Sequence, residues 1–79
     1  MRIIGQDKDV DVPYEFVTLS IIGYTVIHAY MSERGFYLGT YSTESKTKAV
    51  LMDIVTKYKE KAEYYEMPLD EEVLTHEEE

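Results

Sequence analysis

The pattern of apolar and polar positions begins with short β-prone segments. Residues 2–4 (RII) predict a strand, and the polar stretch that follows them closes at Pro13 as a loop. Residues 14–20 alternate well enough between apolar and polar side chains to predict a second strand. Gly23 then breaks the run. The first part of the chain is therefore expected to form two strands joined by a loop.

Residues 24–31 predict the clearest strand, because they are dense in β-branched and aromatic residues and contain neither Gly nor Pro. Residues 36–41 predict a further strand. The connection between them, Ser32–Gly35, has four residues, and Gly35 can adopt a positive φ angle there. We therefore expect these two strands to form an antiparallel hairpin.

A helical pattern follows the hairpin. Ser42 is a suitable N-cap, because its hydroxyl can accept a hydrogen bond from a free backbone N–H in the first turn. Pro68 disfavours helical geometry in the residue before it, so we expect the helix to run from about Thr43 to about Glu66. Its apolar residues recur at three- and four-residue intervals and form one stripe: Val50, Leu51, Ile54, Val55, Tyr58, Ala62 and Tyr65.

These elements predict an α+β fold, a small antiparallel sheet of three to four strands packed on one long C-terminal α-helix. A chain of 79 residues has room for one hydrophobic core. We therefore expect a single domain over residues 1–66. Residues 67–79 are acidic and poor in apolar side chains, which predicts a flexible tail.

The expected helix is longer than the expected sheet. About 24 helical residues span roughly 36 Å, whereas strands of six or seven residues reach only about 20 Å. The last helical turns carry Ala62, Tyr64 and Tyr65. We therefore expect these residues to contact a second subunit or a partner.

One helix can cover only one face of the sheet, and residue parity predicts what the other face presents. If Ile27 and Ala29 face the helix, the residues between and around them face away. The same parity in the next strand gives an outer face rich in tyrosine: Tyr24, Val26, His28, Tyr30, Tyr37 and Tyr41. Such a face suits a protein interface, although it is also compatible with a merely amphipathic sheet, and a register slip by one residue would invert the assignment.

The net charge of −8 is unevenly distributed. Residues 1–65 are nearly neutral, whereas the end of the chain holds acidic residues with no Lys or Arg among them: Glu66, Asp70, Glu71, Glu72, Glu77, Glu78 and Glu79. We expect this acidic segment to meet a basic surface. The helical lysines are interrupted by Asp53, Glu60 and Glu63, so nucleic acid is not an expected partner.

Three aspartates match the start of an EF-hand loop (Asp7, Asp9 and Asp11), but the rest of the motif is absent. Val12 stands where the loop needs glycine, and Thr18 stands where it needs a bidentate glutamate. We therefore interpret this segment as a solvated polar loop.

The remaining chemistry-bearing residues form no recognisable site. His28 and His76 are not in a metal-ligand spacing, and no serine or threonine stands in a motif that supplies a base and an orienting group. We expect no catalytic residue, no metal and no cofactor, and hence no enzyme. The chain has no cysteine and no apolar run long enough to span a membrane, so we expect a cytoplasmic protein without membrane contact.

Three segments carry a family resemblance, MRIIGQD, DVDVPYE and YSTESKTKA, and the match falls on residues 1–7, 11–15 and 41–49. They resemble a pattern, MRIISQDG…DxPYE…YSTEEKA, found in small uncharacterised proteins of phages and prophages of Gram-positive bacteria. Gly5 replaces the usual serine, and Lys8 replaces the expected glycine. The resemblance implies a phage or mobile-element accessory protein that inhibits a host function such as antiviral defence.

Together these observations favour a non-enzymatic interaction protein, homodimeric through the tyrosine-rich face or the helix overhang, with a host protein as target. The alternative is a small-ligand binder that sequesters a nucleotide signal. Its tyrosines would then stack on a base, and Arg2, Arg34 or the helical lysines would bind phosphate.

Overall fold

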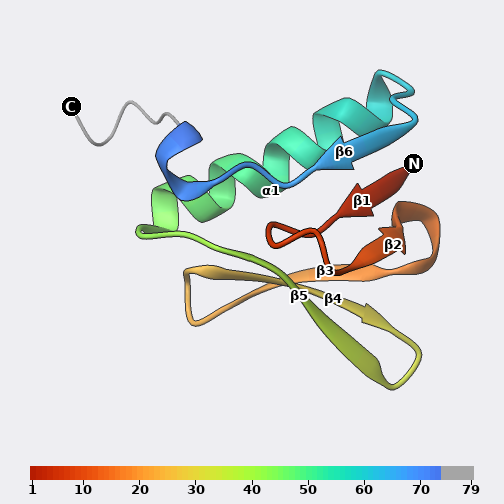
Figure 1. Ribbon diagram of the computed structural model, residues 1–79, viewed down its shortest axis with the longest axis horizontal. Helices are drawn as coiled ribbons and strands as arrows, with labels where there is room; N and C mark the ends of the chain where they lie inside the picture. Colours follow the sequence, from red (N-terminus) through yellow and green to blue (C-terminus); the bar gives the residue numbers. More distant parts are fainter. Residues whose placement is uncertain (74–79) are drawn as a thin grey trace.

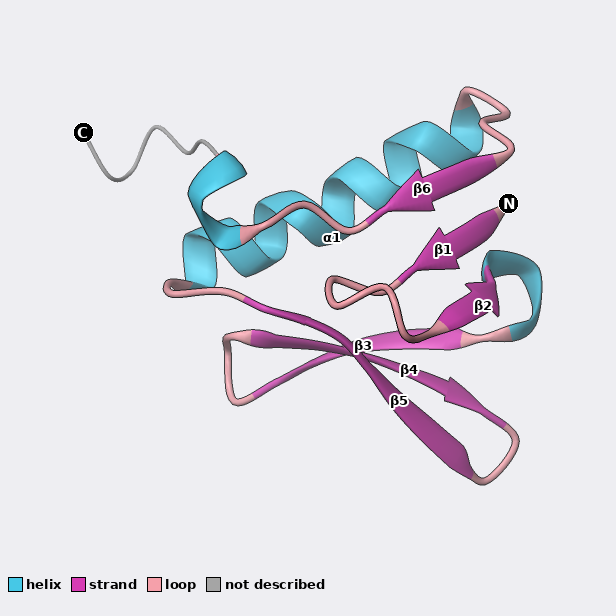
Figure 2. Cartoon of the chain, viewed as in Figure 1, coloured by secondary structure: helices cyan, strands magenta, loops and turns pink. Residues whose placement is uncertain are grey.

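A computed structural model describes residues 1–73 and confirms the α+β class (Figures 1 and 2). The strands are β1 (Arg2–Ile4), β2 (Asp11–Pro13), β3 (Thr18–Ile22), β4 (Val26–Met31), β5 (Arg34–Thr40) and β6 (Tyr64–Glu66). The helices are α1 (Glu44–Lys59) and the short 3₁₀ helices η1 (Tyr14–Phe16) and η2 (Asp70–Glu72). The expectation of one sheet was wrong, because the strands form two three-stranded sheets.

The first sheet has the order β2-β1-β6. Its central strand, β1, pairs antiparallel with β2 and parallel with β6. Parallel neighbours need a long crossover, and here the crossover contains the entire second sheet and α1. The first strand of the chain thus pairs with β6, the last strand among the described residues.

The second sheet is an antiparallel meander in the order β3-β4-β5. The expected strand over residues 14–20 was placed too early, because Tyr14–Phe16 form η1 and β3 begins at Thr18. The β4–β5 hairpin is confirmed, but its connection has two residues rather than four. The positive φ angle falls on Ser32, at 57°, and Gly35 lies within β5.

The expected helix over residues 43–66 was too long, because α1 ends at Lys59 and is followed by β6 and η2, so it is not C-terminal. Its N-cap is Thr43 instead of Ser42, and the Thr43 hydroxyl accepts a hydrogen bond from the Lys46 backbone N–H. At the other end, Lys61 adopts a φ angle of 64° and its N–H donates to the Tyr58 carbonyl, while the Ala62 N–H donates to Lys57. This pair of bonds is a Schellman motif, which ends the helix and turns the chain back.

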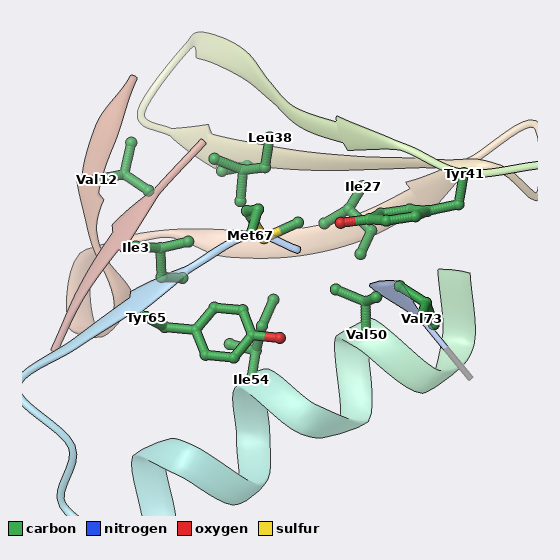
Figure 3. Packing of buried hydrophobic residues seen from close by; sticks show 11 residues of the cluster. Ile3, Val12, Ile27, Leu38, Tyr41, Val50, Ile54, Tyr65, Met67 and Val73 are labelled. Atoms are coloured by element: carbon green, nitrogen blue, oxygen red, sulfur yellow. The ribbon is translucent and has the colours of Figure 1, made fainter. Parts of the chain in front are cut away.

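The core lies between α1 and the two sheets (Figure 3). Val50 and Ile54 point from α1 toward Ile27 of β4. The first sheet closes the core from the side. The fully or nearly buried residues of the core are Ile3, Val12, Ile27, Ala29, Leu38, Tyr41, Val50, Ile54, Tyr65, Met67 and Val73.

The chain after β6 lies against this core, unlike the flexible tail expected from residue 67 onward. Met67 and Val73 are buried, and the Met67 N–H donates to the Ile4 carbonyl. The Asp70 carboxylate accepts from the Ser42 backbone N–H at 2.7 Å, just before α1. The remainder of the expected tail, residues 74–79, lies outside the described residues.

No helix among residues 1–73 is long and apolar enough to cross a membrane.

Candidate functional site

The second sheet has one face turned away from the core, and we call it the outer face. The register places Tyr30 opposite Thr18 and Gly35, and His28 opposite Ser20 and Tyr37. The residues of opposite parity are the buried ones, such as Ile27 and Ala29. The outer face therefore consists of Thr18, Ser20, Ile22, Val26, His28, Tyr30, Gly35, Tyr37 and Thr40.

An aromatic cluster lies at the centre of the outer face. The imidazole of His28 stacks on the Tyr37 ring, with centroids 4.8 Å apart and an angle of 26° between the planes. The edge of Tyr30 contacts the same imidazole at 4.2 Å and 72°. Tyr37 is 70% exposed and Tyr30 is 39% exposed. The cluster therefore presents one histidine and two tyrosines to an incoming surface.

Gly35 makes the cluster possible. A Cβ atom at this position would lie 2.5 Å from Cε1 and 2.6 Å from Nε2 of His28. The imidazole thus occupies the space that any other side chain on β5 would fill. Sequence reasoning assigned Gly35 to the turn and missed this close approach, although a glycine inside a strand indicates such a contact.

His28 is buried although it lies on the outer face, with 9% of its surface exposed. Its Nδ1 atom has no hydrogen-bond partner among the described residues. A buried polar atom without a partner costs about 1–3 kcal/mol. The free protein therefore carries an unsatisfied polar group beneath an exposed tyrosine.

Tyr24 lies on the connection between β3 and β4, at one end of the outer face. It adopts a φ angle of 70° and is 69% exposed. The left-handed region costs a residue with a Cβ roughly 1–2 kcal/mol. The preceding Gly23 also has a positive φ angle, at 60°, so these two residues lie together in the turn that joins β3 to β4.

Tyr41 was expected on the outer face but is 2% exposed and belongs to the core. The reason is a β-bulge: Ile27 pairs with Gly39 and His28 with Tyr37, so β5 contains one extra residue. Every position beyond the bulge changes face. The Tyr41 hydroxyl donates to the Pro68 carbonyl at 2.8 Å, and burial raises the pKa of this tyrosine far above its usual range.

Tyr64 and Tyr65 were expected on a helix overhang, but they lie in β6. Tyr65 is buried, and its hydroxyl donates to Oδ2 of Asp53 on α1 at 2.7 Å. Burial, together with this hydrogen bond, raises the pKa of Tyr65 well above its usual range. Tyr64 is 61% exposed, but it belongs to the first sheet and does not join the outer face.

The acidic residues divide into anchored and exposed groups. Asp70 interacts with Lys46, with 3.5 Å between Oδ2 and Nζ, and the hydrogen bond from the Ser42 backbone lowers the pKa of its carboxyl group. Glu72 accepts from the Leu69 N–H at 2.8 Å. Glu71 is exposed. The remaining acidic residues of the expected tail, Glu77, Glu78 and Glu79, lie outside the described residues.

Within residues 1–73, no three His, Asp or Glu side chains lie close enough together to hold a metal ion. Comparison with protein-family models, with curated proteins and with solved structures finds no match to this chain. The candidate site is therefore defined by its own geometry.

Proposed function

We propose that this protein acts by binding another protein through the outer face of the second sheet, without catalysing a reaction. The observation that carries the proposal is the His28–Tyr30–Tyr37 cluster, which combines exposed aromatic rings with a buried, unsatisfied nitrogen. Tyrosine is enriched at interfaces, because its ring buries a large apolar area while its hydroxyl tolerates water. A partner that displaces the Tyr37 ring could pair with His28 Nδ1.

The charge distribution supports a partner with a basic rim. Asp70 lies 3.5 Å from Lys46 and Glu66 lies 3.4 Å from Lys8, so exposed carboxylates such as Glu71 are the ones left to attract a basic surface and speed association. The resemblance to phage and prophage proteins favours a host protein as this partner, and a defence protein is the specific candidate.

The test uses matched tyrosine variants. Tyr30→Ser together with Tyr37→Ser removes the exposed rings of the outer face, whereas Tyr64→Ser removes a ring of the first sheet whose exposure, 61%, lies between those of Tyr30 and Tyr37. We expect a partner captured from a host extract by the wild-type protein, once purified, to bind the outer-face variant at least about tenfold more weakly. We expect Tyr64→Ser to retain the wild-type affinity.

Calorimetric titration of the purified partner measures both affinities, and far-ultraviolet circular dichroism verifies that each variant is folded. Equal affinities for the wild-type protein and the outer-face variant would contradict the proposal. So would a loss of binding caused only by Tyr64→Ser, because the interface would then lie on the first sheet.

The alternative, sequestration of a nucleotide signal, draws support from one cavity. It has a volume of about 480 Å³ and is lined by Met1, Glu15, Tyr58, Lys59, Lys61 and Ala62. Tyr58 could stack on a base and the lysines could meet phosphate, but Glu15 and the C-terminal end of α1 disfavour an anion there. A rise of several degrees in melting temperature with one nucleotide, lost in Lys59→Ala, would favour this alternative.

A further inference from the structure

Strand β5 forms an edge of the second sheet, and only part of that edge is occupied. At its body end, Gln6 takes the place of a neighbouring strand. The Gln6 backbone N–H donates to the Leu38 carbonyl at 2.6 Å, and its side-chain amide both accepts from the Thr40 N–H at 3.1 Å and donates to the Thr40 carbonyl at 3.2 Å. The edge is therefore closed from Leu38 to Thr40.

The hairpin geometry shows which groups remain open. The two-residue connection makes Met31 and Arg34 the hydrogen-bonded pair next to the turn, and the pairs then alternate along an antiparallel ladder. Ala29 and Phe36 exchange hydrogen bonds. The backbone groups of Gly35 and Tyr37 consequently point away from β4.

No hydrogen bond within residues 1–73 reaches the outward backbone groups of Gly35 and Tyr37. Figure 2 shows the tip half of the β4–β5 hairpin extending away from α1 and from the first sheet. Proteins usually protect such an edge with a charge, a proline or a covering loop. The segment Gly35–Tyr37 contains no charged residue and no proline, although Arg34 precedes it, and no loop within residues 1–73 hydrogen-bonds to its outward side.

We propose that the open edge of β5 pairs with β5 of a second copy of this chain, so that two second sheets join into one six-stranded antiparallel sheet. With a two-fold axis at Phe36, Gly35 of each copy faces Tyr37 of the other. Both residues expose their N–H and C=O groups at this edge, so the register forms four hydrogen bonds. Each Gln6 limits the pairing to this segment.

The chemistry of the segment suits a second copy. Phe36, half-buried on the inner side, would meet its symmetry mate at the axis. The paired segment, Gly35–Tyr37, contains no charged residue, so the register brings no like charges together. The other edge of this sheet, β3, offers small polar side chains such as Thr18 and Ser20 on its outer face instead.

This pairing uses backbone groups, whereas the proposed function uses side chains, so one pair of variants separates the two. Tyr37→Pro removes the outward N–H and the ring, and proline is tolerated on a sheet edge. Tyr37→Val removes the ring but keeps the N–H. We expect Tyr37→Pro to dimerise at least about tenfold more weakly than Tyr37→Val, because each dimer loses two hydrogen bonds.

Analytical ultracentrifugation measures the two dimer dissociation constants. If they are equal, the pairing does not use this edge and the proposal is overturned. Loss of partner binding in both variants, with dimerisation lost only in Tyr37→Pro, is the result expected when the proposed function and the dimer are both correct. Retained partner binding in both variants would count against the outer face and leave the edge pairing intact.

Amide hydrogen exchange of the wild-type protein provides a measurement that needs no variant. Once the dimer predominates, we expect exchange of the Gly35 and Tyr37 amides to slow about tenfold or more relative to dilute protein. The amides of Leu19 and Ile21, which point outward from β3 by the same alternation, are the internal control and should not change. Protection at Leu19 and Ile21 instead, or a monomer at every concentration, would overturn the proposal.

Discussion

At the scale of single residues, His28 carries an energetic cost that no contact within residues 1–73 relieves. Its ring packs well between Tyr30 and Tyr37, but the buried Nδ1 atom lacks a hydrogen-bond partner. Packing and polar satisfaction thus oppose one another at this position. A purely structural role would be served better by an aromatic ring without a polar atom.

We therefore expect His28→Phe to raise the free energy of unfolding by about 1 kcal/mol, because it keeps a flat ring and removes the unsatisfied nitrogen. Under the proposed function, the same variant should bind the partner more weakly. Urea denaturation measures the first effect and calorimetric titration the second. A less stable variant would mean that Nδ1 already has a favourable interaction in the free protein.

At the scale of elements, the end of α1 depends on one residue with unfavourable backbone geometry. Lys61 occupies the left-handed position of the Schellman motif, where glycine is the usual residue. The turn that it makes allows Tyr64–Glu66 to return as β6 beside β1. The helix end and the first sheet are therefore coupled.

We expect Lys61→Gly to stabilise the protein by about 1 kcal/mol, because glycine adopts this conformation without a Cβ clash. The matched control is Lys59→Gly, in the last helical turn, which should destabilise by about 1 kcal/mol. Thermal unfolding followed by circular dichroism measures both changes. If Lys61→Gly proved as destabilising as the control, the left-handed assignment at residue 61 would be wrong.

The same elements explain how far sequence reasoning could reach. The hairpin and the outward positions of His28, Tyr30 and Tyr37 were predictable, because strict alternation holds from Val26 to Tyr37. Tyr41 was misplaced because a bulge adds one residue, and Gly39 inside the strand was the available sign of it.

The helix end was misplaced for a different reason. Apolar spacing continues past Lys61, and a lysine at the left-handed position gives no glycine signal. The strand that follows, β6, has three residues, which is too short to show a period of its own.

At the scale of the whole molecule, Asp70 joins the last described segment to the start of α1. Its carboxylate accepts from the Ser42 N–H at 2.7 Å and lies 3.5 Å from the Lys46 ammonium. It also places a negative charge near the positive end of the helix dipole. The segment that begins at Met67 is held at both ends, since Met67 itself is buried.

The lowered pKa of Asp70, caused chiefly by the Ser42 backbone hydrogen bond, predicts a pH dependence of stability. A carboxyl whose folded pKa lies below its unfolded value, about 3.9, stabilises above that value and loses its contribution as pH falls through the folded pKa. We expect Asp70→Asn to lower the melting temperature at neutral pH and to match the wild-type protein in strong acid. Melting curves across this range provide the measurement.

The control for this prediction is Glu71→Gln, which removes an exposed neighbouring charge from the same 3₁₀ helix. It should leave the melting temperature nearly unchanged at every pH. If Asp70→Asn differed from the wild-type protein by the same amount in acid as at neutral pH, the carboxylate charge would not be the cause of the stabilisation.

The central position of β1 in the first sheet has a consequence for biosynthesis. Residues 2–4 are synthesised well before their parallel neighbour, β6, which follows all of α1. Ile3, which is fully buried in the folded protein, therefore lacks its neighbour in β6 until that strand has been translated. The first sheet is thus completed only once β6 has been made, and until then a chaperone would find exposed backbone and apolar groups at β1.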